Sequence, residues 1–190
     1  MDKELQSKLQ KVRLIAMDFD GIHTDGCVYT DQDGRETVRC SRIDGLGLEM
    51  IRKKTKIALC VVSKEVNPVV SSRCKKLQIA SYQAIENSEG KLEILKRIMA
   101  EQGISPEEVV YMGDDLNDIA VLRYVGVPIT VPNGHPLVKN VCVYITTASG
   151  GNGAIRELCE AILAANGVEL KFYIGLAVCS STRKRRFLLL

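Results

Sequence analysis

The chain contains no tryptophan and few aromatic residues of any kind. Only 5% of its 190 residues are aromatic, namely three Phe and six Tyr. Proteins that bind single-stranded nucleic acids stack the bases on aromatic rings, so this scarcity argues against a nucleic-acid partner. Long hydrophobic runs are missing too, and none approaches the roughly 20 apolar residues that a membrane helix needs. We therefore expect a protein that binds neither nucleic acid nor membrane.

Disulfide and zinc patterns are also lacking. The seven cysteines are odd in number, include no Cys-x-x-C pair and lie partly in apolar runs such as Leu59-Cys60-Val61-Val62. Cysteines of this kind behave as small buried apolar residues in a reducing compartment. The two histidines, His23 and His135, have no second ligand at zinc spacing. The polar N-terminal segment shows no signal peptide, so we expect a cytoplasmic protein.

Excess positive charge is confined to the C-terminal end. The net charge of +3 comes from 26 basic and 23 acidic residues. Residues 171–190 hold five basic residues and no acidic one, so residues 1–170 carry 21 basic and 23 acidic groups, a net charge of −2. We expect one domain over 1–170 that does not attract polyanions by charge. The basic and apolar tail at 171–190 is atypical, and a disordered end, a cloning or frameshift product, or a segment that packs on a neighbouring subunit would explain it.

The hydrophobic pattern of residues 12–165 alternates between two periods. Short apolar runs predict buried strands at 12–17, 57–62, 79–82, 109–112 and 127–131. Apolar residues at helical spacing predict helices at 44–54, 68–77, 89–102, 116–124 and 153–165. This alternation predicts an α/β, Rossmann-like fold with a mostly parallel sheet between two helical layers. Residues 27–31 and 36–40 flank an Asp-Gly turn and predict a projecting β-hairpin, and no gap is long enough for a cap domain.

Polar side chains follow the strands at the edge of the sheet where such folds bind ligands. Asp18 and Asp20 follow the first strand, Ser63 the second, and Asp114 the strand at 109–112, while Lys91 opens a helix. Carboxylates this close cannot all stay ionised without a cation, and Mg²⁺ accepts carboxylate, water and phosphate oxygens. A hydroxyl and a lysine suit a phosphoryl group. Each motif alone is often only a turn or a cap, but their ordered combination predicts a phosphoryl-transfer site.

The same motifs resemble those of a known family over about residues 12–165. Asp18-x-Asp20-Gly21, Ser63, Lys91 and Gly113-Asp114-x-x-x-Asp118 are similar to the four motifs of the haloacid-dehalogenase-like (HAD-like) phosphatases. Three further segments resemble the capless subgroup that dephosphorylates 3-deoxy-2-keto sugar acids: Thr24-Asp25-Gly26, residues 42–47 and residues 150–157. The resemblance implies a HAD-like fold without a cap domain.

The resemblance also implies a role for each matching residue. Asp18 would be the nucleophile that forms an aspartyl-phosphate, and Asp20 the general acid and then the base. Asp18, the main-chain carbonyl of Asp20 and Asp114 would hold Mg²⁺, with Asp118 behind them on the same helix face. Ser63 and Lys91 would bind the phosphoryl group. The sugar would be bound by Thr24, Arg42, Lys64 and Glu65.

The second motif bears on the sugar. Enzymes for the eight-carbon 3-deoxy-manno-octulosonate (KDO) 8-phosphate typically have Thr-Gly-Arg there, whereas this chain has Ser63-Lys64-Glu65. An acid at the third place resembles the enzymes for nine-carbon 9-phosphates of sialic acid or ketodeoxynononate (KDN). We therefore expect a nine-carbon substrate, with KDO 8-phosphate as the alternative. Asn152 stands where many relatives have a basic residue, which leaves that sugar contact open.

The subgroup also implies how the chain assembles. Its members form homotetramers in which hairpins pack together and a neighbour covers each site, and leaving Val28, Tyr29 and Val38 of the hairpin in water would be costly. Some acylneuraminate cytidylyltransferases carry a similar C-terminal domain, which implies a functional link to such an enzyme. The similarity to that domain leaves a second interpretation, in which the chain is a non-catalytic oligomerisation domain. The retained carboxylate cluster argues against this interpretation, because a scaffold has no use for a cluster that is costly to bury.

Overall fold

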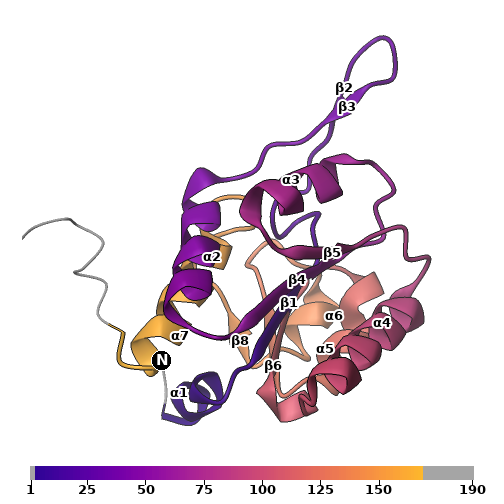
Figure 1. Cartoon of the computed structure of the whole chain (residues 1–190). Coiled ribbons are helices and arrows are strands. Elements are labelled where there is room, and N and C mark those ends of the chain that lie inside the picture. Colours follow the sequence, from indigo (N-terminus) through magenta and orange to yellow (C-terminus); the bar gives the residue numbers. More distant parts are fainter. Residues whose placement is uncertain (1–2, 169–190) are drawn as a thin grey trace, which may run out of the picture.

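The computed structural model describes residues 3–168, which share one six-stranded sheet (Figure 1). The strand order is β5-β4-β1-β6-β7-β8, and every neighbouring pair is parallel. The strands are β1 (Leu14–Met17), β4 (Ala58–Val62), β5 (Ala80–Tyr82), β6 (Val109–Met112), β7 (Val127–Thr130) and β8 (Tyr144–Ile145). The predicted parallel α/β sheet is confirmed. The tail at 171–190 lies outside the described residues.

Helices cover both faces of the sheet, as the alternation of hydrophobic periods predicts. The helices are α1 (Lys3–Gln10), α2 (Arg42–Lys54), α3 (Val69–Leu77), α4 (Ser88–Gln102), α5 (Ile119–Tyr124), α6 (Pro136–Lys139) and α7 (Ala154–Ala165), with short 3₁₀ turns η1 (Pro106–Glu108) and η2 (Leu116–Asp118). Side chains of β1 alternate between two cores: Ile15 and Met17 pack with α1, α2 and α7, whereas Leu14 and Ala16 pack with α4 and α5. Because the side-chain period of a strand is two, β1 joins the two helical layers.

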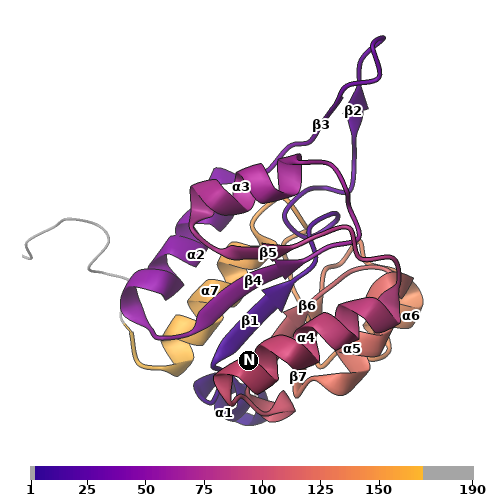
Figure 2. The ribbon, with the colours of Figure 1, turned by 45° about the vertical axis from the view of Figure 1, so that its right-hand side comes forward.

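The β-hairpin of β2 (Tyr29–Thr30) and β3 (Glu36–Thr37) projects from the three-layer body, as both views show (Figures 1 and 2). Its turn is held by Asp31, whose Oδ1 accepts hydrogen bonds from the backbone N–H groups of Asp33 and Arg35. Val28 and Tyr29 are 52% and 60% exposed. Val38, by contrast, is half-buried within its own chain, against a core cluster that includes Phe19 and Val70. No cap domain is present in the described part.

Three elements and one cysteine differ from the prediction. Helix α1 and strand β8 were not predicted, since α1 buries only two leucines and β8 has only two residues. The helix predicted at 116–124 begins as the 3₁₀ turn η2, because Asp115 and Asp118 form a reciprocal cap around it. Cys27 is exposed, unlike the buried Cys60, Cys74 and Cys159.

A buried carboxylate joins two helices behind the site. Helix α7 begins after Gly153 and has no side-chain cap of its own. Asp44 of α2 supplies one, because its carboxylate accepts hydrogen bonds from the backbone N–H groups of Gly153 and Arg156 at 3.2 and 2.8 Å. The start of α7 is therefore fixed by a residue more than 100 positions earlier. Across residues 3–168, no helix is long and apolar enough to span a membrane.

Candidate active site

Three neighbouring strands bring the predicted polar residues to one edge of the sheet. Asp18 follows β1, Ser63 follows β4 and Asp114 follows β6, and β1 lies between β4 and β6. The Asp18 N–H donates to the carbonyl of Met112, and the Ser63 N–H donates to the carbonyl of Tyr82, so both residues prolong the ladder of the sheet. Rigid strand ends of this kind hold side chains more precisely than loops do.

Lys91 lies buried beneath this edge and binds two carboxylates. Its Nζ lies 2.9 Å from Asp18 Oδ2 and 2.8 Å from Asp118 Oδ1. Burial alone would lower the pKa of Lys91, but the two carboxylates outweigh it and raise this pKa above its ordinary value. Asp118 also accepts a 2.7 Å hydrogen bond from the Tyr111 hydroxyl. Lys91 is therefore a charged group whose position is fixed from two sides.

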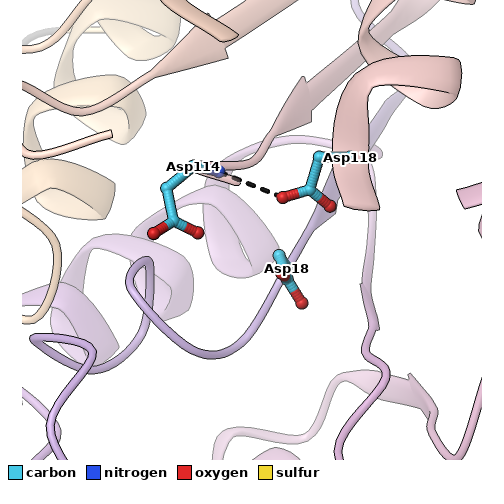
Figure 3. A group of neighbouring side chains, drawn as sticks. All are labelled: Asp18, Asp114 and Asp118. Carbon is cyan, nitrogen blue, oxygen red and sulfur yellow. Dashed lines mark hydrogen bonds between the residues drawn. The ribbon is translucent and has the colours of Figure 1, made fainter. Parts of the chain in front are cut away.

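Three carboxylates meet next to Lys91. Oxygen atoms of Asp18, Asp114 and Asp118 lie within 4.8 Å of one another (Figure 3). Burial and the charge of Asp118 raise the pKa of Asp114 to about 7, and the same two causes raise the pKa of Asp18. One ammonium does not balance three carboxylates, so the site lacks positive charge. A hard divalent cation would supply it.

Both carboxylate oxygens of Asp118 already accept hydrogen bonds from other groups of the protein. Its Oδ2 accepts hydrogen bonds from the backbone N–H groups of Asp114 and Asp115, in addition to the bonds from Lys91 and Tyr111 to Oδ1. Asp18 and Asp114 are therefore better placed to bind a cation, with Asp118 holding them in position. Asp114 precedes η2 rather than belonging to a helix, so the expected common helix face was wrong, although the two residues do lie side by side (Figure 3).

Gly21 allows the loop after β1 to approach Asp114. The φ of Gly21 is +72°, a left-handed conformation that L side chains rarely adopt. A Cβ at this position would lie 1.9 Å from Asp114 Oδ2. The glycine of the Asp-x-Asp-Gly motif is therefore required by the closeness of two carboxylate-bearing loops.

A cavity of about 360 Å³ opens on this site. It is lined by Asp18, Asp20, Ser63, Lys64, Glu65, Val66 and Asn117. Five of the residues predicted from the sequence therefore share one cavity. Asp20 is half-buried, and burial together with the nearby Glu65 raises the pKa of its carboxyl group. A raised pKa favours the protonated form that a general acid needs.

Two predicted substrate residues lie outside the lining of this cavity. Thr24 is fully buried, and its hydroxyl accepts hydrogen bonds from the N–H groups of Gly21 and Gly26, both at 3.1 Å. Thr24 thus shapes the loop after β1. Arg42 is exposed and lines a separate cavity of about 300 Å³, together with Arg73 and Lys76.

Two asparagines, Asn152 and Asn117, also lie near the site. The Oδ1 of Asn152 accepts a 2.9 Å hydrogen bond from Arg39, which also forms an ion pair with Asp25. Asn152 thereby holds the base of the hairpin. Asn117 lines the cavity but was given no role from the sequence. Its position in the sequence between Asp114 and Asp118 could have indicated that it lies near the site.

Comparison with known proteins identifies the family. Residues 48–158, more than half of the chain, match the model of the haloacid dehalogenase-like hydrolases. The chain belongs to this family of hydrolases. The HAD-like fold and the phosphatase class expected from the four motifs are confirmed.

Relatives within the family share nearly the whole chain. The 3-deoxy-D-manno-octulosonate 8-phosphate phosphatase of Escherichia coli is 33% identical over 165 residues, which cover 86% of each chain. The enzyme of that name from Moraxella catarrhalis, solved with magnesium, phosphate and KDO, is 36% identical with a TM-score of 0.85, over 92% of this hydrolase and 98% of that chain. The Haemophilus influenzae enzyme, solved with cobalt, is 28% identical with a TM-score of 0.78, over 84% and 92% of the two chains.

Proposed function

We propose that this hydrolase removes phosphate from a 3-deoxy-2-keto sugar acid by way of an aspartyl-phosphate on Asp18. The observation that carries the proposal is the group of Asp18, Asp114 and Lys91 at one sheet edge. Asp18 also lines a cavity there, together with Asp20 and Ser63. Mg²⁺, the ion in the related Moraxella structure, would be held by Asp18, the Asp20 carbonyl and Asp114. When bound, it supplies positive charge that neutralises the phosphoryl oxygens.

The nucleophile is oriented before substrate arrives. The N–H of Phe19 donates to Asp18 Oδ1 at 2.7 Å, while Lys91 pairs with Oδ2. An oxygen of Asp18 attacks phosphorus, the new O–P bond forms, and the bond from phosphorus to the sugar oxygen breaks. Asp20 donates a proton to the departing sugar oxygen.

The second half of the reaction returns the site to its first state. Asp20, now ionised, accepts a proton from a water molecule, whose oxygen attacks phosphorus. The bond between phosphorus and Asp18 breaks, and inorganic phosphate leaves. Lys91 and the Ser63 hydroxyl hold the phosphoryl oxygens in both steps, since phosphoryl transfer depends mostly on positioning and charge neutralisation.

For the sugar, we propose a preference for nine-carbon 9-phosphates of KDN or N-acetylneuraminate. Glu65 supports it, because this carboxylate lines the cavity. Its Oε1 accepts hydrogen bonds from the N–H groups of Val66 and Asn67, both at 2.7 Å, which fixes the side chain. The second oxygen can then accept hydrogen bonds from the hydroxyls or amide of a long substrate. Such a bond to a charged group is worth roughly 10- to 150-fold in affinity.

Steady-state kinetics on both sugar acid phosphates test this preference. We expect a higher kcat/KM for the nine-carbon substrate, and Glu65→Gln should erode the difference while retaining the oxygen that binds Val66 and Asn67. Glu93→Gln, the same change at an exposed position on α4, is the matched control. A wild-type preference for KDO 8-phosphate would refute the assignment.

KDO 8-phosphate is the second candidate substrate. The relatives in Escherichia coli and Moraxella catarrhalis carry that activity in their names. The sequence difference that speaks against it is Glu65, which stands where those enzymes typically have an arginine. The two candidates share the same bond cleavage, so the kinetic comparison above separates them directly.

We further propose a homotetramer with the hairpins at its centre. Val28 and Tyr29 are exposed on a hairpin that projects from the body (Figure 2), and a neighbouring copy would bury them. Light scattering should give about four times the 21.0 kDa chain mass, and a fully active monomer would refute the assembly.

A cytoplasmic location and a functional link to a cytidylyltransferase that uses the sugar product also belong to this proposal.

A further inference from the structure

The loop after β5 supports one wall of the catalytic cavity. Residues 63–66 supply four of the seven residues that line this cavity, and they lie against residues 83–85 of the loop. Backbone N–H groups of the loop donate to the carbonyls of Ser63 and Glu65 at 3.3 and 3.1 Å. The position of this wall is therefore set from outside the cavity, by residues that do not line it.

A side chain of the same loop completes this support. The amide Nε2 of Gln83 donates a hydrogen bond to the carbonyl of Val66 at 3.2 Å. Its Oε1 is shielded from solvent, and no group in residues 3–168 donates a hydrogen bond to it. An unpaired, shielded acceptor is costly, but turning the amide over would set Oε1 against the Val66 carbonyl, which is also an acceptor. The contact with Val66 is therefore the one that the fold retains.

The contact with Val66 reaches Glu65 through one peptide group. The carbonyl of Val66 and the N–H of Asn67 belong to the same peptide, which is planar and rigid. The carbonyl end accepts the hydrogen bond from Gln83, and the N–H end donates to Glu65 Oε1 at 2.7 Å. The amide of Gln83 therefore fixes the plane of a donor that holds the Glu65 carboxylate, and hydrogen bonds in such a chain strengthen one another.

The backbone next to Gln83 adopts a strained conformation. The φ of Ala84 is +61°, in the left-handed region that few residues other than glycine adopt. Strain of this kind persists where the surrounding structure enforces it, and it concentrates near functional sites. The strained residue itself donates its N–H to the Glu65 carbonyl, so the strain accompanies the contact between the two loops.

We propose that Gln83 is a positioning residue for substrate recognition. Through the peptide between Val66 and Asn67, it holds the Glu65 carboxylate where this group accepts hydrogen bonds from the sugar. The inference rests on the role of Glu65 in the proposed function. Gln83 does not line the cavity, so its effect on the reaction passes through Glu65.

A double-mutant cycle tests this route. The quantity compared is the kcat/KM for the sugar acid phosphate that the wild type cleaves fastest, divided by the kcat/KM for p-nitrophenyl phosphate, an ester without a sugar. Gln83→Met keeps the length of the side chain but removes the donor, so it should lower this ratio by roughly 3- to 10-fold, the value of an ordinary hydrogen bond. Gln83→Glu should lower it further, because a carboxylate then faces the Val66 carbonyl. In a Glu65→Ala background, Gln83→Met should change the ratio by less than about twofold, since the group that it positions is gone.

Amide hydrogen exchange on the full chain tests the positioning without any substrate. Gln83→Met should speed the exchange of the Val66 and Asn67 N–H groups several-fold. Gln6→Met, the same change at an exposed position on α1, is the control and should alter neither the exchange nor the ratio. Losses that multiply in the double variant, or unchanged exchange at Asn67, would overturn the inference. A wild type that cleaves no sugar acid phosphate faster than p-nitrophenyl phosphate would instead contradict the proposed function, and the exchange would still decide the role of Gln83.

Discussion

Removal of the buried ammonium of Lys91 should destabilise the fold as well as the activity. In Lys91→Met, the side chain keeps its length and apolar stem, but Asp18 and Asp118 lose the cation that lies 2.9 and 2.8 Å away. Both carboxylates are almost fully buried. Breaking a buried ion pair from one side typically costs about 3–5 kcal/mol, because the remaining charge has no partner.

This cost translates into a measurable shift in unfolding. For a protein of this size, each kcal/mol lowers the melting temperature by about 2–4 °C, so Lys91→Met should melt roughly 6–20 °C below the wild type in the presence of a chelator. Mg²⁺ should restore part of the loss by binding the orphaned carboxylates. Lys75→Met, at an exposed position on α3, provides the control for the same change of residue type.

The effect should depend on pH in one direction. Burial already raises the pKa of Asp18 in the folded protein, and Lys91 opposes that rise. Without Lys91, this pKa lies further above the unfolded value of about 3.9, so stability is lost as the pH rises from there through the folded pKa. The difference between wild type and variant should therefore be larger at pH 8 than at pH 5. A loss below about 1 kcal/mol at pH 8 would refute the reasoning.

Two other substitutions test the geometry around the site. Gly21→Ala should lower activity at least about tenfold, because its Cβ would collide with Asp114. Gly34 has a similar φ of +76° and free space around it, so Gly34→Ala should affect stability alone. Equal activity of the two variants would contradict the close approach of Gly21 to Asp114. Asp44→Ala should lower the free energy of unfolding by about 1–3 kcal/mol, because it leaves two N–H groups at the start of α7 unpaired. An unchanged midpoint of unfolding in urea would contradict the role of Asp44 as the cap.

The fold was predictable where hydrophobic periodicity is strong. Strands such as β1 and β6 are fully buried runs, and α4 repeats its apolar residues at helical spacing, so their type and place follow from the sequence. Helix α1 was missed because its two buried leucines stand in a polar segment. Its stability comes from packing on α7, a contact between opposite ends of the described chain that no local pattern contains.

The site was predictable at the strand ends and less so away from them. Asp18, Ser63 and Asp114 meet because parallel strands bring their carboxyl ends to one edge. Thr24 and Arg42 belong to a loop and a helix start whose direction depends on packing, and both lie outside the lining of the cavity. Asn117 was missed because an asparagine next to capping residues reads as part of the turn, and only the structure reveals that it lines the cavity.

The turnover of Asp18→Asn tests the central claim most directly. This change keeps the shape of the side chain but removes the charge that attacks phosphorus and contributes to the cation site. Asp33→Asn, at an exposed position in the hairpin turn, is the control. With Mg²⁺ and the best sugar acid phosphate, the account predicts a kcat for Asp18→Asn that is lower by orders of magnitude in a protein that remains folded. Retention of more than about 5% of wild-type turnover, a barrier change of less than about 2 kcal/mol, would contradict it.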